Sequence, residues 1–395
     1  MQWNDEQRAF RTTVAGLSEV FNADHIERDA TGTFSRDHWK RLADTGLLGL
    51  PFGEEVGGLG QSLLTTLYVL EGLGQHCRDA GLSFSVSTHM VSVGVPLDRF
   101  GSDALKARFL PGITAGTTIG AHAITEPDGG SDVMGMRTTA VADGDDYVLD
   151  GGKTFVSNGP IADVFVVYAR TGRPSNPAGI TAFLVERGTP GLSVGQPIGK
   201  MGLRTSPLSE LRFDAMRIPK SQVIGSVGAG FLVLDHVMKW EILCSFMINV
   251  GEMQHRLDRC VSYARSRTQF GSHIGAYQSV SNKIVQMRID VETSRMWLYR
   301  TAEKLMAGED VAVDIAIGKL LASEGNVRTA LSAVQIFGGY GYTTEYGLEK
   351  DVRNAVAGTI YSGTTEIQHQ RIAALMGLDR PQFRGKSATA SRTET

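Results

Sequence analysis

A run of small, polar and acidic residues at 123–132 (AITEPDGGSD) could carry chemistry. Thr125 and Ser131 offer hydroxyl groups, and Pro127 restricts the backbone. The glycine pair at 129–130 lets backbone N–H groups approach an anionic or polar ligand closely, because glycine has no Cβ. The same composition is also typical of an ordinary acidic turn. The segment by itself therefore indicates either a ligand-binding loop or a plain turn.

Other motifs for catalysis or cofactor binding are weak or missing. The sequence has no cluster with metal-ligand spacing and no Gly-x-Ser-x-Gly nucleophile elbow, so we predict no metal site. The glycine-rich segments 228–230 and 338–341 do not lie between a strand pattern and a helix pattern. A dinucleotide fingerprint requires that context, so a Rossmann site is not expected.

Three stretches of different texture must position these residues. Residues 1–118 carry apolar residues at spacings of three and four, which predicts an N-terminal α-helical domain. Residues 119–225 change to short β-rich runs divided by Gly, Pro and Asp, which predicts a middle β domain. Helical periodicity returns over 226–380 and predicts a C-terminal four-helix bundle, whereas the polar residues 381–395 predict a flexible tail. The expected fold class is therefore α+β.

Composition and charge narrow the class of protein. The chain has 395 residues, of which 42% are hydrophobic and 21% charged, typical of a globular protein with two or three packed units. The net charge of −3 offers no basic surface for nucleic acid. There is no apolar run of about 18 residues and no signal-peptide pattern. We therefore expect neither nucleic acid nor membrane as a partner, and a cytoplasmic location.

Seven segments, in the same order along the chain, resemble the acyl-CoA dehydrogenase family. They are ITEPDGGSD (124–132), GGKTFVSNG (151–159), KMGLRTSPLSELRFDAMRIP (200–219), GAGF (228–231), ARSRTQFG (264–271), QIFGGYGYTTEY (335–346) and IYSGTTEIQ (360–368). The resemblance covers nearly the whole chain. It implies the acyl-CoA dehydrogenase fold, FAD as cofactor, and an oxidoreductase that removes hydrogens from the α and β carbons of an acyl thioester.

The resemblance also implies a set of contacts on the flavin side of FAD. They would be made by His122, Ile124, Thr125, Ser131, Phe155, Ser157, Thr364 and Glu366. Ser131 would reach the pyrophosphate. Phe155 and Ser157 stand where Trp and Thr are common in the family, and they keep the aromatic face and the hydroxyl. Thr364 could equally cap the helix that follows it.

A second set of expected FAD contacts resembles the part of the family that clasps the cofactor from a neighbouring subunit. It consists of Arg267, Phe270, Gln335, Gly338 and Gly339. The planar fork of an arginine suits a phosphate, so Arg267 would bind the pyrophosphate while Phe270 packs on the adenosine. A single chain would then have an incomplete cofactor site, and we expect a homo-oligomer, either a dimer or a tetramer.

The reaction needs a carboxylate that takes the α proton while hydride leaves for the flavin N5. Many family members have a Glu where this chain has Ser362, which cannot serve as that base. In a branch resembling isovaleryl-CoA and long-chain acyl-CoA dehydrogenases, the Glu lies on the helix after GAGF. Counting along that segment places Glu241 there, so Glu241 is the candidate base. The alternative interpretation is a surface carboxylate on an amphipathic helix.

The expected substrate contacts surround this carboxylate. They are Ser131, Trp240, Ile242, Tyr361 and Ser362. The resemblance implies that the thioester carbonyl is held by the ribityl hydroxyl of FAD and by the backbone N–H at Ser362. Tyr361 would wall the substrate cavity.

The nature of the thioester remains open between two carriers. The segment 239–242 (KWEI) lacks the acid and the arginine common in members that use CoA, and several segments resemble members acting on carrier-protein thioesters, such as prolyl-carrier-protein dehydrogenases. An acyl or aminoacyl carrier protein of secondary metabolism is therefore expected, with a short or branched-chain acyl-CoA of catabolism as the alternative. A non-catalytic, flavin-free binding protein is the alternative from another class. The expected electron acceptor is an electron-transferring flavoprotein, with oxygen as the second possibility.

Overall fold

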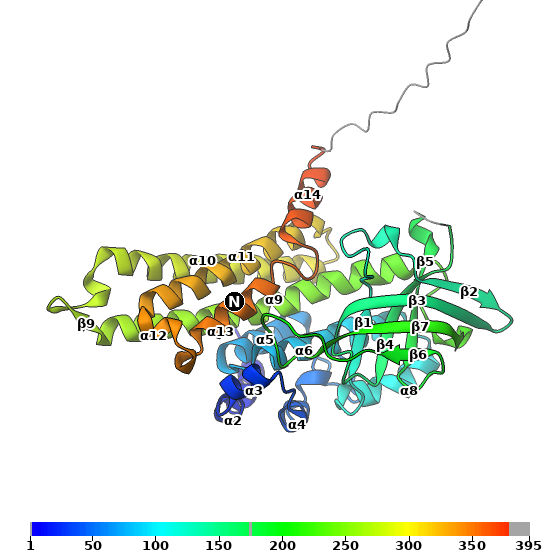
Figure 1. Cartoon of the computed structure of the whole chain (residues 1–395), viewed down its shortest axis with the longest axis horizontal. Coiled ribbons are helices and arrows are strands. Elements are labelled where there is room, and N and C mark those ends of the chain that lie inside the picture. The colour runs from blue at the N-terminus through cyan, green and yellow to red at the C-terminus, as the bar shows by residue number, and fades with distance from the viewer. Residues whose placement is uncertain (1, 174–175, 379–395) are drawn as a thin grey trace, which may run out of the picture.

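The chain folds as helices, then a sheet, then helices again (Figure 1). This computed structural model describes residues 2–173 and 176–378. The N-terminal helices are α1 (Asp5–Ala15), α2 (Ser18–Asn22), α3 (His25–Thr31), α4 (Arg36–Asp44), α5 (Leu63–His76), α6 (Ala80–His89), α7 (Val95–Phe100) and α8 (Asp103–Thr114). A π-helical turn, η3 (Met90–Gly94), joins α6 to α7 without a break. Serine side chains cap three of these helices, since Ser35 accepts from the His38 N–H, Ser62 from the Thr65 N–H and Ser102 from the Leu105 N–H.

The middle of the chain forms one twisted sheet. Its strands are β1 (Gly120–Ala123), β2 (Thr139–Asp143), β3 (Asp146–Ser157), β4 (Val164–Arg170), β5 (Ile180–Glu186), β6 (Leu192–Val194), β7 (Leu208–Pro219) and β8 (Val223–Ile224). They run in the order β6-β7-β3-β2-β4-β5-β8, and β1 pairs with β4 in parallel. Every residue of β4 is buried. Val166 and Tyr168 face the helical core, whereas Phe165 and Val167 face the core of the β domain.

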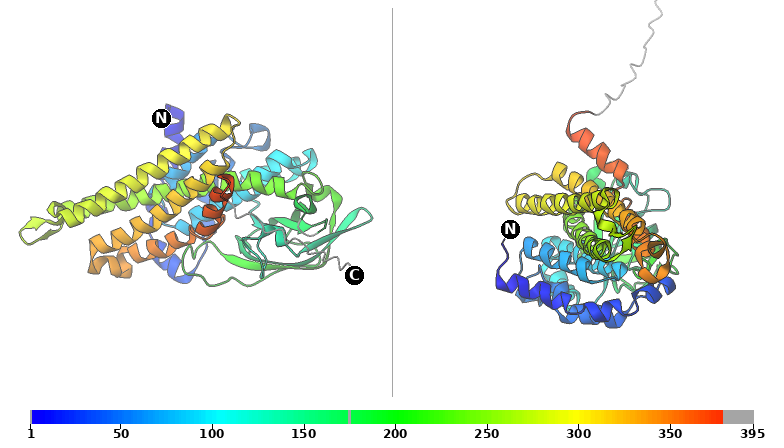
Figure 2. Two further views of the ribbon diagram at one scale, coloured as in Figure 1. Left: turned by 90° about the horizontal axis from the view of Figure 1, so that it is seen from above. Right: turned by 90° about the vertical axis from the view of Figure 1, so that its left-hand side faces the viewer.

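The C-terminal part is built around three long helices. The elements are α9 (Gly230–Ser266), β9 (Thr268–Gln269), β10 (Ser272–His273), α10 (Gln278–Met306), α11 (Ala312–Phe337), α12 (Gly339–Tyr342), α13 (Leu348–Ala357) and α14 (Thr365–Leu375). α9 packs between α5 and α11, and α13 packs on α11. α14 contacts α11 and projects from the bundle (Figures 1 and 2). None of the described helices is long and apolar enough to cross a membrane.

These elements confirm the predicted α+β class and the acyl-CoA dehydrogenase order of helical, β and helical parts. The sheet begins at Gly120, and the C-terminal helices begin at Gly230. Residues 379 and 380 and the predicted flexible tail, 381–395, lie outside the described residues.

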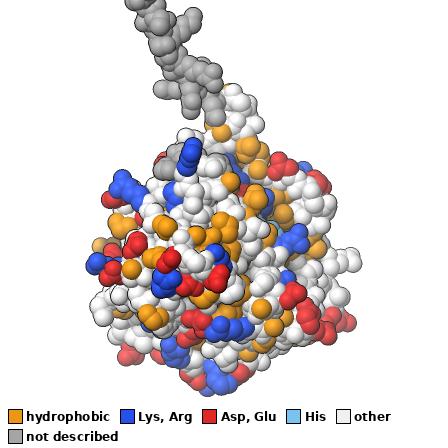
Figure 3. All heavy atoms as spheres, turned by 90° about the vertical axis from the view of Figure 1, so that its right-hand side faces the viewer, with side chains coloured by type: hydrophobic (Ala, Val, Ile, Leu, Met, Phe, Trp, Pro, Cys, Tyr) orange, Lys and Arg blue, Asp and Glu red, His pale blue; other side chains and the backbone are white. Residues whose placement is uncertain are grey.

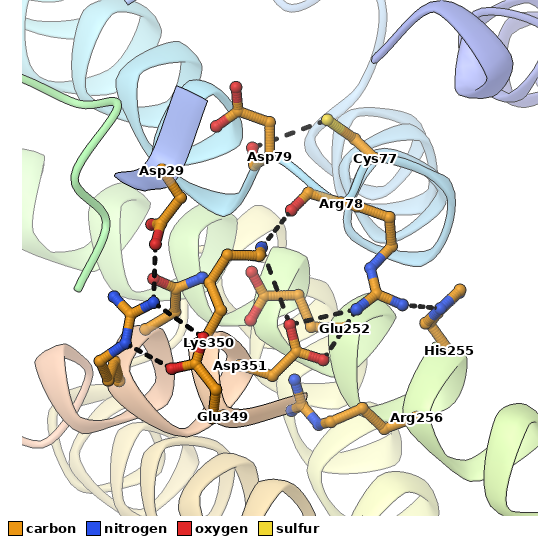
Figure 4. A network of polar contacts seen from close by, with 12 residues as sticks. Asp29, Cys77, Arg78, Asp79, Glu252, His255, Arg256, Glu349, Lys350 and Asp351 are labelled. Atoms are coloured by element: carbon orange, nitrogen blue, oxygen red, sulfur yellow. Dashed lines mark hydrogen bonds and ion pairs between the residues drawn. The ribbon is translucent and has the colours of Figure 1, made fainter. Parts of the chain in front are cut away.

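A network of buried charges ties the N-terminal helices to α9 and α13 (Figure 4). Arg78, in the link between α5 and α6, binds Asp351 of α13 at 2.9 Å, and the Lys350 ammonium donates to the Arg78 carbonyl at 2.7 Å. Burial and the charge of Arg78 lower the pKa of His255 to about 3, so this ring is neutral and accepts a hydrogen bond from Arg78. Burial alone would raise the pKa of Asp351, but the charges of Arg78 and Lys350 outweigh it and hold that pKa well below its usual range.

Candidate active site

Glu241 lies on α9, at the start of a stretch from Glu241 to Met253 that is mostly buried. Its side chain is only 11% exposed, and Ile242 and Leu243 beside it are core residues. Burying a carboxylate is costly unless hydrogen bonds compensate it. Three side chains from three different elements supply polar contacts to Glu241, so the surface-carboxylate interpretation is wrong.

The first of these contacts comes from Ser362, in the loop between α13 and α14. Its hydroxyl donates to Glu241 Oε1. Ser362 has φ +54°, and the following Gly363 has φ +85°, so the loop turns sharply and brings the hydroxyl toward α9. The Gln368 amide fixes the loop by donating to the Ser362 carbonyl at 2.9 Å. Ser362 therefore lies against the candidate base, a contact that the sequence did not predict.

The second contact comes from Ser92 in the π-helical turn η3. Its hydroxyl donates to Glu241 Oε2 at 3.3 Å. A π turn inserts one extra residue and changes which side chains face a neighbouring helix, and such turns are frequent at functional sites. Helical periodicity alone does not reveal such a turn, so no pattern in the sequence points to Ser92.

The third contact comes from His122 of β1. Its Nε2 lies 3.6 Å from Glu241 Oε2. Burial lowers the pKa of His122, so the ring is neutral near pH 7. The strand alternation explains this position, because Ala121 and Ala123 point into the β core and His122 points to the other face, toward α9.

An aromatic wall stands next to the carboxylate. The Tyr361 ring stacks on Phe246 at 5.2 Å and lies 4.9 Å from Phe84. Its hydroxyl hydrogen-bonds Ser245, one helical turn beyond Glu241, at 2.8 Å. A small cavity borders Tyr361, Phe84 and Ser245. Glu241 and Ser362 do not line this cavity, so a substrate contact of Tyr361 stays a prediction.

Two more of the predicted substrate contacts, Trp240 and Ile242, are the chain neighbours of Glu241 and do not line this cavity. Ile242 is 1% exposed and belongs to the helical core, and Trp240 packs partly buried against the same core. Neighbouring residues of a helix point to different sides, so Trp240 and Ile242 do not point in the same direction as Glu241. Their contact with the substrate stays a prediction.

Several predicted flavin-side residues of the β domain lie together, on the segment after β1 and on β3. The Thr154 N–H donates to the Thr125 carbonyl at 2.8 Å and the Lys153 ammonium to the Ile124 carbonyl at 2.9 Å, which joins the segment after β1 to β3. Phe155 is 62% exposed, with φ +54°, so a large aromatic face is left uncovered here. Such a surface of aromatic and hydroxyl groups suits a flat ligand.

Three further residues predicted to contact FAD are Ser131, Thr364 and Glu366. Ser131 is exposed in the loop after the Gly129–Gly130 pair. Thr364 caps α14 by accepting a hydrogen bond from the Ile367 N–H at 3.3 Å, which agrees with the capping alternative and leaves a ligand contact possible. Glu366 is exposed in the first turn of α14.

A buried ion pair that the sequence did not single out shapes the loop that carries Ser131. The Glu126 carboxylate binds the Lys153 ammonium at 2.8 Å and accepts the N–H groups of Arg137 and Thr138. Burial alone would raise the pKa of Glu126, but the charge of Lys153 and these hydrogen bonds lower it. Glu126 therefore has a structural role.

The second predicted set of cofactor residues lies at the opposite end of the bundle (Figure 1). Arg267 ends α9 and lies over the Tyr340 ring at 5.9 Å, which places it near Gly338 and Gly339. Phe270, in the turn between β9 and β10, is 95% exposed. All five residues of this set are exposed, namely Arg267, Phe270, Gln335, Gly338 and Gly339. The two predicted sets of cofactor residues thus lie in separate places on one chain.

Comparison with known proteins agrees with this geometry. The N-terminal domain of acyl-CoA dehydrogenases matches residues 4–117, the middle domain residues 121–216 and the C-terminal domain residues 228–377. The chain belongs to the acyl-CoA dehydrogenase family. Its members are oxidoreductases that act on CH–CH bonds, so the predicted enzyme class is confirmed.

Several relatives in the acyl-CoA dehydrogenase family carry names that specify a carrier. An L-prolyl-[peptidyl-carrier protein] dehydrogenase of a Serratia species is 40% identical over 375 residues, which cover 95% of this chain and 97% of the relative. The crystal structure of the prolyl acyl carrier protein oxidase AnaB superposes with a TM-score of 0.93 at 38% identity, covering 95% of this chain and 100% of that one. PigA with FAD and proline superposes with a TM-score of 0.93 at 39% identity, covering 96% and 99%.

Proposed function

We propose that this chain is an FAD-dependent dehydrogenase that oxidises the α,β bond of an acyl or aminoacyl thioester held by a carrier protein in secondary metabolism. The observation that carries the proposal is the buried Glu241 carboxylate, held by Ser362 and Ser92 beside His122 of the β domain. The names of the relatives support the carrier protein. A short or branched-chain acyl-CoA is the second candidate, supported by the family itself.

The residues present fit FAD. The exposed face of Phe155 and the hydroxyls of Thr125 and Ser157 would hold the ring, and Ser131 would approach the pyrophosphate. When bound, FAD supplies the acceptor for the hydride that leaves the β carbon. The structure of PigA with FAD supports this assignment.

The residues of the chain itself perform the proton transfer and hold the carbonyl. Glu241 takes the α proton, and its contacts with Ser362 and Ser92 aim the carboxylate. The backbone N–H of Ser362 donates to no acceptor within residues 2–173 and 176–378. It is therefore available for the thioester carbonyl, where negative charge develops as the proton leaves. Tyr361 closes the far side and excludes water.

Ser362 acts as a positioning residue, and its removal should reduce turnover. We expect Ser362→Ala to lower kcat about 10-fold while KM changes little, because a hydrogen bond to a charged group is lost but the backbone N–H remains. Steady-state kinetics with a carrier-bound thioester measure both constants. Ser362→Gly is the matched control, since glycine relaxes the positive φ and also lacks the hydroxyl. A normal kcat in the glycine variant would show that backbone strain, rather than the hydroxyl, causes the loss.

We propose that the cofactor site is completed by a second copy of the chain. Arg267 and Phe270 lie at the far end of the bundle from Phe155, so they would serve the site of a partner in a homo-oligomer. We expect Arg267→Glu to bind FAD about 10- to 100-fold more weakly, since a charge-assisted contact to phosphate becomes a repulsion. The ratio of flavin to protein absorbance after dialysis measures this loss.

A mixing experiment tests whether Arg267 acts across subunits. Arg267→Glu and Glu241→Gln chains are co-expressed with different tags, and the mixed oligomers are purified. A partner's Arg267 would complete the site that retains Glu241, so the mixed oligomers should be active although each variant alone is not. Mixed oligomers as inactive as the separate variants would contradict the proposal.

The proposal also names two partner molecules, the protein that carries the thioester and the electron acceptor. Acidic and basic side chains are interspersed on the face of the β domain that Figure 3 shows, and no single sign dominates it. An electron-transferring flavoprotein is the proposed acceptor, with oxygen as the second candidate, which the oxidase name of the AnaB relative favours.

Anaerobic reduction of the bound flavin tests the proposed function. The purified yellow protein is mixed with a thioester on a carrier protein and with the same acyl group on CoA, and the loss of flavin absorbance is followed near about 450 nm. We expect faster bleaching with the carrier protein. Faster bleaching with CoA would contradict the carrier assignment, and no bleaching with any thioester would contradict dehydrogenation.

A further inference from the structure

Two buried polar groups near Glu241 have no hydrogen-bond partner among the described residues. They are His122 Nδ1 and the Tyr168 hydroxyl. Both lie on the same face of the sheet, since His122 of β1 pairs in register with Val166 and Tyr168 is the next residue of β4 to face that way. Burial and the nearby charge of Glu241 raise the pKa of Tyr168, so its hydroxyl stays protonated. Leaving such groups unpaired is costly, so each is available to a hydrogen-bond partner from outside the chain, either a bound molecule or a water.

The contact with Glu241 determines which nitrogen of His122 is free. Nε2 lies 3.6 Å from Glu241 Oε2, and the negative charge of the carboxylate favours the tautomer of the neutral ring in which Nε2 carries the proton. Nδ1 is then an acceptor without a donor. The partner that Nδ1 lacks is therefore a hydrogen-bond donor. This donor would lie across the imidazole ring from Glu241.

The position of the reacting carbon identifies that donor. A base in near-attack position lies about 3–3.5 Å from the carbon whose proton it takes. A nitrogen bonded to that carbon lies about 1.5 Å farther at most. An amine on the α carbon would thus stand beside Glu241 and in reach of His122, whereas the carbon skeleton of an ordinary acyl group has no donor to offer.

We propose that His122 is a specificity-determining residue that accepts a hydrogen bond from an amine on the α carbon, and that the substrate is an α-aminoacyl thioester. The inference rests on the proposed function and narrows it. The Glu241 carboxylate attracts the same amine when it is protonated, so His122 and Glu241 together select for nitrogen at that position. The Tyr168 hydroxyl lies on the same face and can extend the polar surface around the amine.

A pair of isosteric thioesters tests the inference. L-prolyl and cyclopentanecarbonyl groups have the same ring size and differ by the amine, and both are loaded on one carrier protein. We expect kcat/KM for flavin reduction to be about 10- to 100-fold higher for the prolyl thioester in the wild type. His122→Phe should lose most of this preference. His122→Asn, which keeps a hydrogen-bond acceptor, should retain part of it.

A binding measurement separates failure of the inference from failure of the proposed function. Wild-type protein whose bound FAD has been reduced beforehand is titrated with both thioesters under anaerobic conditions, and calorimetry gives each Kd without turnover. A preference for binding the prolyl thioester that His122→Phe abolishes supports the role of His122, whether or not flavin is reduced. If the wild type does not reduce its flavin, the proposed function is contradicted. Equal binding and equal kcat/KM for the two thioesters, or a preference that survives in His122→Phe, would overturn the role of His122.

Discussion

Replacing Glu241 by Gln should leave a folded, yellow protein whose rate of flavin reduction falls by about 10²- to 10⁴-fold. The expected loss reflects the removal of the general base, while glutamine keeps the size of the side chain and can still hydrogen-bond Ser362 and Ser92. Stopped-flow absorbance under anaerobic conditions measures the rate. The FAD content should stay normal, because no cofactor contact is expected of Glu241.

A second carboxylate on the same helix provides the control for this variant. Asp258 lies on the exposed side of α9, where it accepts a hydrogen bond from Gln254 at 2.8 Å. Asp258→Asn removes a charge from α9 without touching the buried site and should reduce flavin at the wild-type rate. A wild-type rate in Glu241→Gln would show that another group takes the α proton.

Replacing Asp351 by Asn should have the largest effect on stability. The variant leaves Arg78 and Lys350 buried without their carboxylate, and breaking a buried ion pair in this way lowers the free energy of unfolding by about 3 kcal/mol or more. Denaturant unfolding at pH 7 measures the difference. Glu345→Gln, an exposed change near α13, is the matched control and should be neutral within about 0.5 kcal/mol.

The difference between wild type and Asp351→Asn should also depend on pH. The pKa of Asp351 is lowered in the folded protein, so its charge stabilises the fold above the unfolded pKa of about 3.9. That contribution is lost as the pH falls through the lower, folded value. The wild type should therefore lose more stability than the variant in acid, and the two unfolding curves should converge below about pH 4. Parallel curves down to strong acid would contradict the assigned role of Asp351.

The arrangement of the three parts could be predicted from the sequence. The long helices α9, α10 and α11 show strong periodicity, and the fully buried strand β4 is a continuous apolar run. Counting from the glycines at 228–230 makes Glu241 the candidate base, a role that stays a prediction, and the count applies because α9 is a single unbroken helix.

The surroundings of Glu241 could not be predicted in the same way. Ser92 and Ser362 are 149 and 121 residues from Glu241, so their contacts depend on how the three parts pack together. The π-helical turn that directs Ser92 has no clear sequence pattern. His122 was assigned to the flavin ring alone, whereas the parallel pairing of β1 with β4 also turns it toward the base.

The mass of the carrier-bound product tests the central claim most directly. A carrier protein loaded with L-prolyl thioester is incubated with the wild type or with Glu241→Gln and an excess of an artificial electron acceptor, and the intact carrier is weighed by mass spectrometry. We predict that the wild type removes pairs of hydrogens from the acyl group and that Glu241→Gln leaves its mass unchanged. An unchanged mass with the fully flavin-loaded wild type, or an equal loss of hydrogens with both proteins, would contradict the account.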